Sequence, residues 1–334
     1  MPYYPSAPPK FSIVSGKHGE LGSIGAKQLI RPNFFIIGAP KCGTTALGHY
    51  LSEHPAVFFS EPKEPFYLSD DYPKLKEQHL LRELDDYLKL FQDADPRIHQ
   101  SIGEGSTNYL ASKNAVSNAI GLNPKAKFIV MLRNPVQVVH AYHMEQVWAR
   151  NEDEPNFETA WRLQSARKSG QRIPRSCVAE QFLQYQDLAT FSPQIKRLQT
   201  VVPTEQVLVL LLDDLKEDPA EVYRKVLKFL DLHDDGRVVF PVVNPSHKHR
   251  FEWFADFILR PPRFLEEPMF RFRRWARLRR PWIIDAVKSM LRVSSKRRAI
   301  SAEFERELYA SFHSDVVELE ALIRRDLSSW KAPG

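Results

Sequence analysis

The sequence has few cysteines, no long apolar run and no metal-binding pattern, and each absence excludes a class of protein. Two cysteines among 334 residues, Cys42 and Cys177, are too few for a disulfide framework. The eleven histidines form no HxxxH pair and the cysteines no CxxC pair, so we expect no structural zinc site. No stretch approaches the ~18 uninterrupted apolar residues of a membrane span, and the N-terminus lacks the apolar core of a signal peptide. These absences predict a soluble protein of a reducing compartment, with a cytoplasmic location.

Positive charge is concentrated in one part of the chain. The net charge is +6, but residues 260–298 hold 13 Lys and Arg against three acidic residues, a local charge of +10 that leaves −4 for the rest. This stretch, the basic segment, interleaves arginines with aromatic residues, which suits an anionic glycan or the surface of an anionic membrane. The alternative is a pair of core-packing helices with a solvated arginine face. No base-reading motif accompanies the charge, so we do not expect nucleic acid as a partner.

Short apolar runs alternate with helical patterns along most of the chain. The runs NFFIIGA (33–39), AVFFS (56–60), KFIVMLR (127–133) and VLVLLLDDL (207–215) are typical of buried strands. Helical patterns follow at 44–54 and 74–91, another helix starts at Asp218-Pro219, and a last one begins near Ser301. The alternation predicts an α/β fold with a P-loop-like parallel sheet flanked by helices and a helical C-terminal elaboration. We divide the chain into an arm (1–30), a core (31–250) and an Arg-rich elaboration packed on the core (251–334).

The stretch IIGAPKCGTT, residues 36–45, has the glycine spacing of a phosphate-binding loop. Gly38 and Gly43 match GxxxxG, and a glycine turn before a helix N-terminus points backbone N–H groups at an anion. A loop that binds Mg-ATP would place lysine directly after the second glycine, with Ser or Thr next as a Mg²⁺ ligand. Here Thr44 follows Gly43, and Lys41 lies inside the loop. The frame predicts a phosphate-bearing ligand, while the lysine disfavours a nucleoside triphosphate.

Two ionisable side chains follow predicted strands, at the carboxyl edge where open α/β sheets bind ligands. Glu64 in EPKEPFYL is a candidate general base, the alternative being that Glu61 and Glu64 are solvated loop carboxylates. Arg133 ends KFIVMLR directly before the helix-capping Asn134, where a guanidinium can hold a phosphate. The alternative for Arg133 is a structural ion pair.

Three other segments leave alternatives open. VLVLLLDDL ends in aspartates like a Walker B strand, and this is the one feature that favours a Mg-ATP-dependent kinase. VNPSHKHR (243–250) is dense in donors, so it could close over an anion or serve as a solvated connection. His140 and His143 lie on one helix three residues apart, a spacing that fits hydrogen-bonded packing better than a metal site.

Taken together, these segments resemble the sulfotransferases that use 3′-phosphoadenosine 5′-phosphosulfate (PAPS), in particular the carbohydrate and heparan-type branch with its bacterial members. GAPKCGTTAL is similar to the family's 5′-phosphosulfate loop, KEPFYL to its KEPHFF element and LRNPVQVVHAYH to its 3′-phosphate motif, LRNPVxRAYSHY. GEGSTNYL (103–110), VLVLLLDDLKEDP and the closing DLSSW also fit. The likeness covers residues 33–249 and resumes in the final helix.

The resemblance implies transfer of a sulfuryl group from PAPS to a hydroxyl of a carbohydrate or glycolipid, without a metal. Lys41 would stabilise the charge that grows on the oxygen bridging phosphate and sulfate, and Glu64 would take the proton of the acceptor hydroxyl. The donor would be held by Lys41, Cys42, Gly43, Thr44, Thr45 and Ala46 in the loop, by Arg133 and the position of Ala141, and by Lys248, His249 and Arg250. A non-enzymatic alternative is an anion- or nucleotide-binding protein held at a membrane by the basic segment.

The sequence departs from the family pattern at two positions. Ala141 stands where a serine usually bonds the 3′-phosphate, and we hypothesise that Lys248, Arg250 or His140 compensates. Phe66 stands where KEPHFF has its histidine. If that histidine orients the catalytic glutamate elsewhere in the family, this chain must orient its base by other means.

Overall fold

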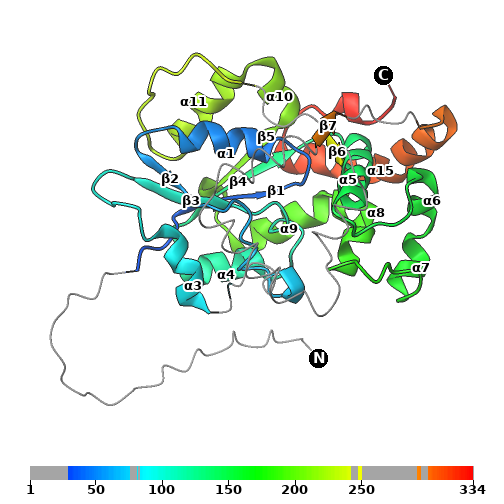
Figure 1. The fold of residues 1–334 in the computed structure, drawn as a ribbon. Helices are drawn as coiled ribbons and strands as arrows, with labels where there is room; N and C mark the ends of the chain where they lie inside the picture. Colours follow the sequence, from blue (N-terminus) through cyan, green and yellow to red (C-terminus); the bar gives the residue numbers. More distant parts are fainter. Residues whose placement is uncertain are drawn as a thin grey trace, which may run out of the picture.

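The computed structural model describes residues 29–75, 81, 83–241, 247–249, 292–294 and 300–333, with backbone alone for 247–249 and 292–294. Within these ranges the chain forms a parallel sheet covered by helices on both faces, with more helices beside it (Figure 1). The predicted fold class is therefore confirmed. Most of the expected arm and most of the basic segment lie outside the described residues, and the division at residues 30 and 250 stays a prediction.

The sheet has five strands in the order β2-β3-β1-β4-β5, and every neighbouring pair is parallel. The strands are β1 (Phe34–Gly38), β2 (Val57–Phe59), β3 (Ser101–Gly105), β4 (Lys127–Leu132) and β5 (Val207–Leu211). All side chains of β1 are buried, as are those of β4 after its first residue, which is why both strands read as unbroken apolar runs. Because β1 lies between β3 and β4, the segments that follow these three strands meet at one edge of the sheet.

Strand β3 is the one strand of this sheet that the apolar runs do not predict. Its sequence, SIGEG, has two glycines and a glutamate, yet all five residues are buried. A Cβ atom at Gly103 would lie 2.4 Å from the carbonyl oxygen of Phe34 on β1. Glycine is needed here because the two strands approach so closely, so close packing rather than hydrophobicity selects the residue.

Helices cover the two faces of the sheet in separate groups (Figure 1). One face carries α1 (Thr44–Ser52), α10 (Leu212–Glu217) and α11 (Pro219–Phe229). The other carries α3 (Leu84–Leu88), the 3₁₀ turn η1 (Lys89–Phe91), α4 (Ala115–Leu122) and α9 (Ser192–Val201), and a further 3₁₀ turn, η3 (Thr204–Gln206), leads into β5. The strands are thus buried from both sides.

Two helices begin at the caps that the sequence predicts. The side chain of Asp218 accepts a hydrogen bond from the Glu221 amide at the start of α11. Ser301 does the same for Phe304 at the start of α15 (Ala302–Ile323), whose regularly spaced apolar residues are buried as expected. These local signals needed no tertiary context.

Two other predicted elements have different boundaries. The VLVLLLDDL run is a strand only to Leu211, and its last residues form α10 with Asp213 and Asp214 in the first turn, where acidic side chains stabilise a helix. Of the helix expected over 74–91, residues 73–75 are helical, and the short helix α3 starts at Leu84 after a capping box between Glu83 and Asp86. Residues 76–80 and 82 lie outside the described residues.

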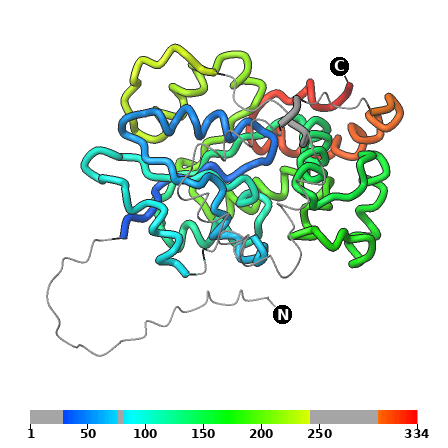
Figure 2. The backbone as a smooth tube through the Cα atoms, in the orientation of Figure 1, coloured from blue at the N-terminus to red at the C-terminus, as the bar shows by residue number. Residues whose placement is uncertain are grey.

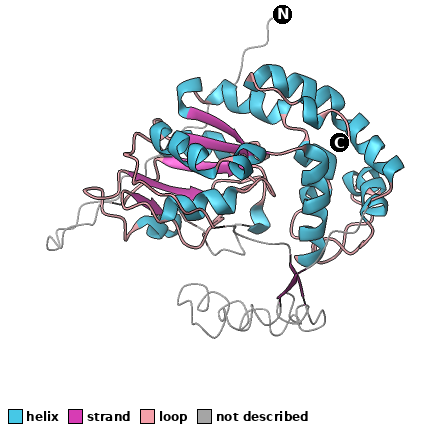
Figure 3. Ribbon diagram, turned by 90° about the horizontal axis from the view of Figure 1, so that it is seen from above, coloured by secondary structure: helices cyan, strands magenta, loops and turns pink. Residues whose placement is uncertain are grey.

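A group of helices, the helical lobe, stands beside the carboxyl edge of the sheet (Figure 3). It comprises α5 (Pro135–Trp148), α6 (Phe157–Arg162), α7 (Gln164–Lys168), η2 (Glu180–Leu183), α8 (Tyr185–Ala189) and α15, which is followed by η4 (Ser328–Trp330). Phe157 is central, with its ring 5.5 Å from that of Phe304 on α15 and 5.9 Å from that of Tyr185. The tube in Figure 2 shows how the C-terminal helix returns to pack beside the middle of the chain.

Two short strands form a separate antiparallel pair. Strand β6 (His247–His249) pairs with β7 (Arg292–Ser294), with Lys248 opposite Val293. The pair therefore brings the end of the expected core next to the end of the basic segment. In the described ranges, no helix is both long and apolar enough to cross a bilayer.

Candidate functional site

The glycine loop joins β1 to α1 at the edge of the sheet that faces α5 (Figure 1). Gly43 is the N-cap of α1 and has a φ of 87°, in the left-handed region. A Cβ atom there would lie 2.6 Å from Cδ1 of Leu212 on α10, so a larger residue would clash as well as be strained. The amides of Ala46 and Leu47 bond to the Gly43 carbonyl and start the helix. The loop thus ends on a helix N-terminus whose first N–H groups have no partner within the helix, which is the geometry of an anion site.

Lys41 contacts two other parts of the site. Its ammonium nitrogen lies 3.7 Å from Oε2 of Glu145 on α5, and its backbone carbonyl accepts a hydrogen bond of 3.3 Å from Nη1 of Arg133. Both side chains of the ion pair are partly exposed: 36% of the Lys41 side chain and 41% of the Glu145 side chain are accessible to solvent. The lysine is therefore held at the surface of the site rather than buried in it.

Arg133 follows β4 and lies directly before α5. The Asn134 side chain accepts from the Val136 amide and caps this helix, as the sequence predicts. The guanidinium also donates from Nε to Gln137 one turn along the helix, at 3.0 Å. Arg133 thus bridges the glycine loop and the N-terminus of α5, two places where backbone N–H groups favour an anion.

A second loop, residues 61–68, approaches the glycine loop from the other side; we call it the Glu64 loop. The Lys63 ammonium donates to Oε1 of Glu64 at 2.8 Å and to the Thr45 hydroxyl at 3.2 Å. The Glu64 side chain is 32% exposed. The structure therefore brings together Lys41, Thr45, Glu64 and Arg133, which come from three segments of the sequence: the glycine loop, the Glu64 loop and the end of β4.

The remaining predicted residues differ in their surroundings. Cys42 is fully buried, and burial raises the pKa of its thiol to about 12, so it packs as a neutral side chain in the loop. Thr44 is also buried, while Ala46 is partly exposed. Ala141 lies buried in α5 and has no polar side-chain atom. Lys248 and His249 are described by backbone alone, and Arg250 lies outside the described residues.

Comparison with known proteins identifies the domain. Residues 31–244 match the family described as the sulfotransferase domain. The chain belongs to the sulfotransferase family. Among curated proteins, the human bifunctional heparan sulfate N-deacetylase/N-sulfotransferase 3 is 29% identical over 219 residues, which are 65% of this chain and 24% of that protein. Carbohydrate sulfotransferase 15 of Mus musculus is 28% identical over 275 residues, with coverage of 66% and 46%.

The family prediction is therefore confirmed, although this chain spans only about a quarter to a half of the length of those two relatives. A solved sulfotransferase structure, from Alicyclobacillus acidocaldarius, is 27% identical and superposes with a TM-score of 0.64. The superposition covers 91% of this chain and all of that one. Its likeness thus extends beyond the residues of the matched domain.

The sulfotransferase domain contains three charged residues near its loops that sequence reasoning did not select. Lys63 bridges Thr45 and Glu64, and its position next to Glu64 in KEPFYL was an available signal. Glu145 faces Lys41, and desolvation by the surrounding protein raises the pKa of its carboxyl, while the Lys41 charge opposes this shift. Glu104, buried in β3, has a carboxyl whose pKa burial raises to about 7. No local pattern marked Glu145, because its partner Lys41 comes from a distant segment. Glu104 lies within GEGSTNYL beside its donors Ser106 and Tyr109, but nothing in that stretch shows that it is placed against the Glu64 loop.

The two histidines of α5 pack in the helical lobe. His140 stacks on Phe157 at 5.4 Å, with the rings 8° from parallel. His143 is hydrogen-bonded through Nε2 to the Glu154 carbonyl, and burial lowers its pKa. The packing interpretation thus accounts for His143, and the His140 ring lies against α6. Within the described ranges, no group of three or more His, Cys, Asp or Glu gathers as metal ligands would.

The aspartates of the Walker B-like run are not at a strand end. They lie in α10, where Asp214 accepts two hydrogen bonds from Arg325, at 2.8 and 2.9 Å, and Asp213 pairs with Lys216 at 2.9 Å. The run is a strand only to Leu211, and both aspartates lie in the first turn of α10, whereas the Walker B pattern places its aspartate at the strand end. Their position and their ion pairs disfavour the Mg-ATP-dependent kinase.

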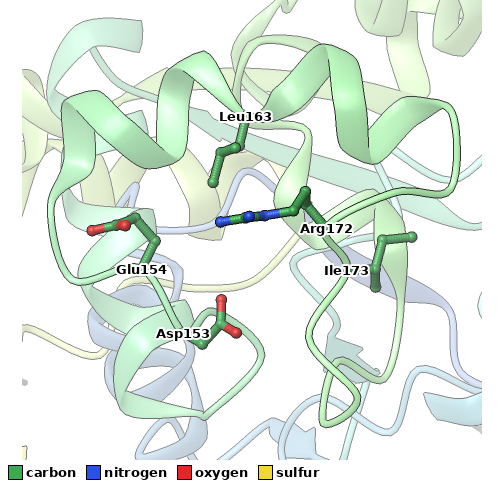
Figure 4. Close-up of a pocket in the computed structure, with 5 residues that line it drawn as sticks. All are labelled: Asp153, Glu154, Leu163, Arg172 and Ile173. Atoms are coloured by element: carbon green, nitrogen blue, oxygen red, sulfur yellow. The ribbon is translucent and has the colours of Figure 1, made fainter.

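A hollow of about 310 Å³ opens in the helical lobe, away from the glycine loop (Figure 4). Asp153 and Glu154 line it after the C-terminus of α5, opposite Leu163, Arg172 and Ile173. The Arg172 side chain extends across the hollow between these walls. Lys41, Glu64 and Arg133 are not among its lining residues, so this hollow is not the predicted donor site.

Proposed function

We propose that this sulfotransferase domain transfers the sulfuryl group of PAPS to a hydroxyl of a carbohydrate or glycolipid acceptor. The observation that carries the proposal is the meeting of Lys41, Arg133 and Glu64 around a glycine loop at the carboxyl edge of the sheet. Two cations and a helix N-terminus suit a polyanionic donor, and a carboxylate beside them suits a proton acceptor. The names of the curated relatives support a carbohydrate acceptor.

The donor would lie across the glycine loop. Gly43, Thr44, Thr45 and Ala46 would hold the 5′-phosphate through backbone N–H groups and hydroxyls, and Arg133 would hold the 3′-phosphate. The loop suits this task because Leu212 and the left-handed Gly43 fix its shape before any ligand arrives. A ligand would then meet preformed donors and pay little for ordering them.

The reaction itself is an in-line displacement at sulfur. The bond from sulfur to the phosphate oxygen breaks while a bond to the acceptor oxygen forms, and the acceptor proton passes to Glu64. Lys41 stabilises the negative charge that develops on the departing phosphate oxygen. Adenosine 3′,5′-bisphosphate and the sulfated acceptor are the products.

Both reactive side chains have partners that they must exchange during this reaction. Lys41 faces Glu145, and Glu64 accepts from Lys63. Donor phosphate and sulfate groups would compete with Glu145 for Lys41 and recruit Lys63, leaving Glu64 free to accept a proton. The lysine therefore changes partner when the donor binds.

The donor site is tested by calorimetric titration of the protein with adenosine 3′,5′-bisphosphate and with ATP, each with and without Mg²⁺. We expect binding of the bisphosphate that does not depend on Mg²⁺ and that weakens at least about tenfold in Arg133→Ala, since a charge-assisted phosphate contact is lost. Gln137→Ala is the matched control, because it removes a partner of Arg133 but keeps the guanidinium. Preference for ATP with Mg²⁺ would overturn the proposal in favour of a kinase.

The acceptor class is tested by turnover. PAPS with a radiolabelled sulfuryl group is incubated with desulfated heparan sulfate. The label is measured in the polysaccharide and in the free sulfate that hydrolysis of PAPS releases. Label in the polysaccharide that depends on Glu64 supports the proposal. Bisphosphate binding without any transfer, unchanged in Glu64→Gln and Lys41→Met, would instead favour a non-enzymatic anion-binding protein.

A further inference from the structure

A buried carboxylate lies directly beneath the Glu64 loop, and no step of the proposed reaction uses it. Glu104 on β3 has no exposed surface and no cation among its hydrogen-bond partners in the described residues. Its carboxylate instead accepts from three hydroxyls: from Ser106 at 2.7 Å, from Tyr109 at 2.7 Å and from Tyr87 at 3.1 Å. Burying a carboxylate without a cation costs free energy of desolvation, so we looked for a contact that explains a glutamate at this position.

Two of these three hydroxyls hold the backbone of the Glu64 loop. The Ser106 oxygen accepts a hydrogen bond of 3.1 Å from the Phe66 amide. The Tyr109 oxygen accepts one of 3.1 Å from the Leu68 amide. A hydroxyl has a single hydrogen, and when Glu104 is ionised each hydroxyl donates that hydrogen to the carboxylate, so its lone pairs are turned toward the loop amides. The carboxylate thus orients both acceptors at once.

The loop needs such support because its backbone is strained. Glu64 has a φ of 61° and Phe66 a φ of 54°, both in the left-handed region that non-glycine residues avoid. Backbone of this kind persists when surrounding bonds hold it, and it often occurs at functional sites. One of the two bonded amides belongs to Phe66 itself, and the other belongs to Leu68, two residues later.

We propose that Glu104 is a positioning residue, which clamps the Glu64 loop through Ser106 and Tyr109 so that the Glu64 carboxylate meets the acceptor hydroxyl in one orientation. The inference rests on the proposed function, in which Glu64 is the base. It explains how the base is oriented in a chain that has Phe66 instead of a histidine: the Phe66 amide, not its side chain, is the anchored group.

The three hydroxyl donors provide a matched comparison. Tyr109→Phe and Tyr87→Phe each remove one hydrogen bond to the same carboxylate oxygen, but only Tyr109 also bonds a loop amide in the described structure. With PAPS and desulfated heparan sulfate, we expect Tyr109→Phe to lower kcat about tenfold, because a displaced base is slow, while the affinity for adenosine 3′,5′-bisphosphate stays unchanged. Tyr87→Phe should lower kcat by less than about threefold. Equal losses of kcat in the two variants would overturn the clamp.

A double variant separates positioning from general loss of structure. Ser106→Ala should lower kcat in the wild type but have no further effect in Glu64→Gln, because there is no base left to position. If Ser106→Ala lowers kcat by the same factor in Glu64→Gln as in the wild type, Ser106 acts independently of Glu64, and the proposal is overturned.

Amide hydrogen exchange keeps this inference distinct from the proposed function. We expect the Phe66 amide to exchange at least about tenfold faster in Ser106→Ala and the Leu68 amide in Tyr109→Phe, with Tyr87→Phe close to wild type. If the wild-type protein transfers no sulfuryl group, the proposed function fails whatever the exchange rates are. If exchange at Phe66 and Leu68 is the same in all variants, the clamp fails even where turnover is observed.

Discussion

Two charge pairs lie beside the same helix, α5, and they differ in almost every respect. Lys41 and Glu145 are 3.7 Å apart, and both remain more than a third exposed. Arg167 and Glu152, past the C-terminus of α5, have no exposed surface in their side chains and form two hydrogen bonds of 2.6 Å, with Tyr185 donating to the same carboxylate. The buried, closely hydrogen-bonded pair is suited to stabilise the helical lobe. The longer, solvated pair can be separated when a ligand binds to its lysine. The contrast predicts that one pair determines stability and the other activity.

The largest effect is expected from breaking the buried pair. Glu152→Ala leaves the Arg167 guanidinium buried without its partner, so the free energy of unfolding should fall by about 3–5 kcal/mol. Urea unfolding measures this change. Asp187→Ala, which breaks the exposed pair with Lys168, is the control and should cost at most about 1 kcal/mol. If Glu152→Ala also lowers the free energy of unfolding by only about 1 kcal/mol, the buried pair does not stabilise the helical lobe.

The opposite profile is expected for the exposed lysine. Lys41→Met should lower the rate of sulfuryl transfer by about 10²–10³-fold, the loss typical of one preplaced donor, while the free energy of unfolding changes by about 0.5 kcal/mol or less. Turnover of PAPS and urea unfolding are measured on the same preparation. Lys216→Met is the matched control, since this lysine is also exposed and paired but lies on α10. Retained turnover in Lys41→Met would remove the lysine from the mechanism.

A third carboxylate sharpens the comparison, because Glu104 is as buried as Glu152 but is hydrogen-bonded to hydroxyls, and to no cation, among the described residues. Burial raises the pKa of Glu104 from its ordinary value of 4.5 to about 7, while the bonds from Arg167 and Tyr185 outweigh burial at Glu152 and lower the pKa there. Between pH 4.5 and about 7, the unfolded chain loses the Glu104 proton and the folded chain keeps it. The folded state therefore binds more protons in this window, and its stability falls as pH rises.

The measurement is the difference in unfolding free energy between wild type and Glu104→Gln. We expect the wild type to lose up to about 3 kcal/mol relative to the variant as pH rises from ~5 to ~8, since glutamine does not titrate. Any stability that the variant lacks for other reasons is an offset that does not depend on pH. A difference that is constant across this range would show that Glu104 is already ionised at pH 5.

Local signals were enough to predict much of this fold and the two loops. Unbroken apolar runs identified β1 and β4, the Asp218 cap identified the start of α11, and the last helix was expected near Ser301, which is its N-cap. Lys41 and Glu64 were recognised because each lies in a short motif next to a strand. All of these features depend on neighbours in the sequence.

What the sequence did not reveal depends on contacts between distant segments. Strand β3 is buried because Gly103 fits against Phe34, which no apolar run records. Glu145 lies twelve residues after Arg133 along α5, and only the position of this helix against the glycine loop brings it to Lys41. Glu104 lies beside its donors Ser106 and Tyr109 in the sequence, and only the tertiary fold places these hydroxyls against the amides of the Glu64 loop. In each case the contact that distinguishes the residue is set by the tertiary fold.

The smallest effect is expected from removing the charge of Glu145, and its direction distinguishes a competitor from a structural partner. Glu145→Gln keeps the size of the side chain but releases Lys41 and removes a negative charge from the anion site. The free energy of unfolding should change by less than about 1 kcal/mol, because the pair is exposed, while the affinity for adenosine 3′,5′-bisphosphate should rise a few-fold at low salt. Glu221→Gln, a surface carboxylate on α11 with similar exposure, should leave the affinity unchanged. Weaker binding in Glu145→Gln would mean that Glu145 holds Lys41 in the orientation that the donor needs. The exposed pair would then be a structural contact like the buried pair, although a weaker one.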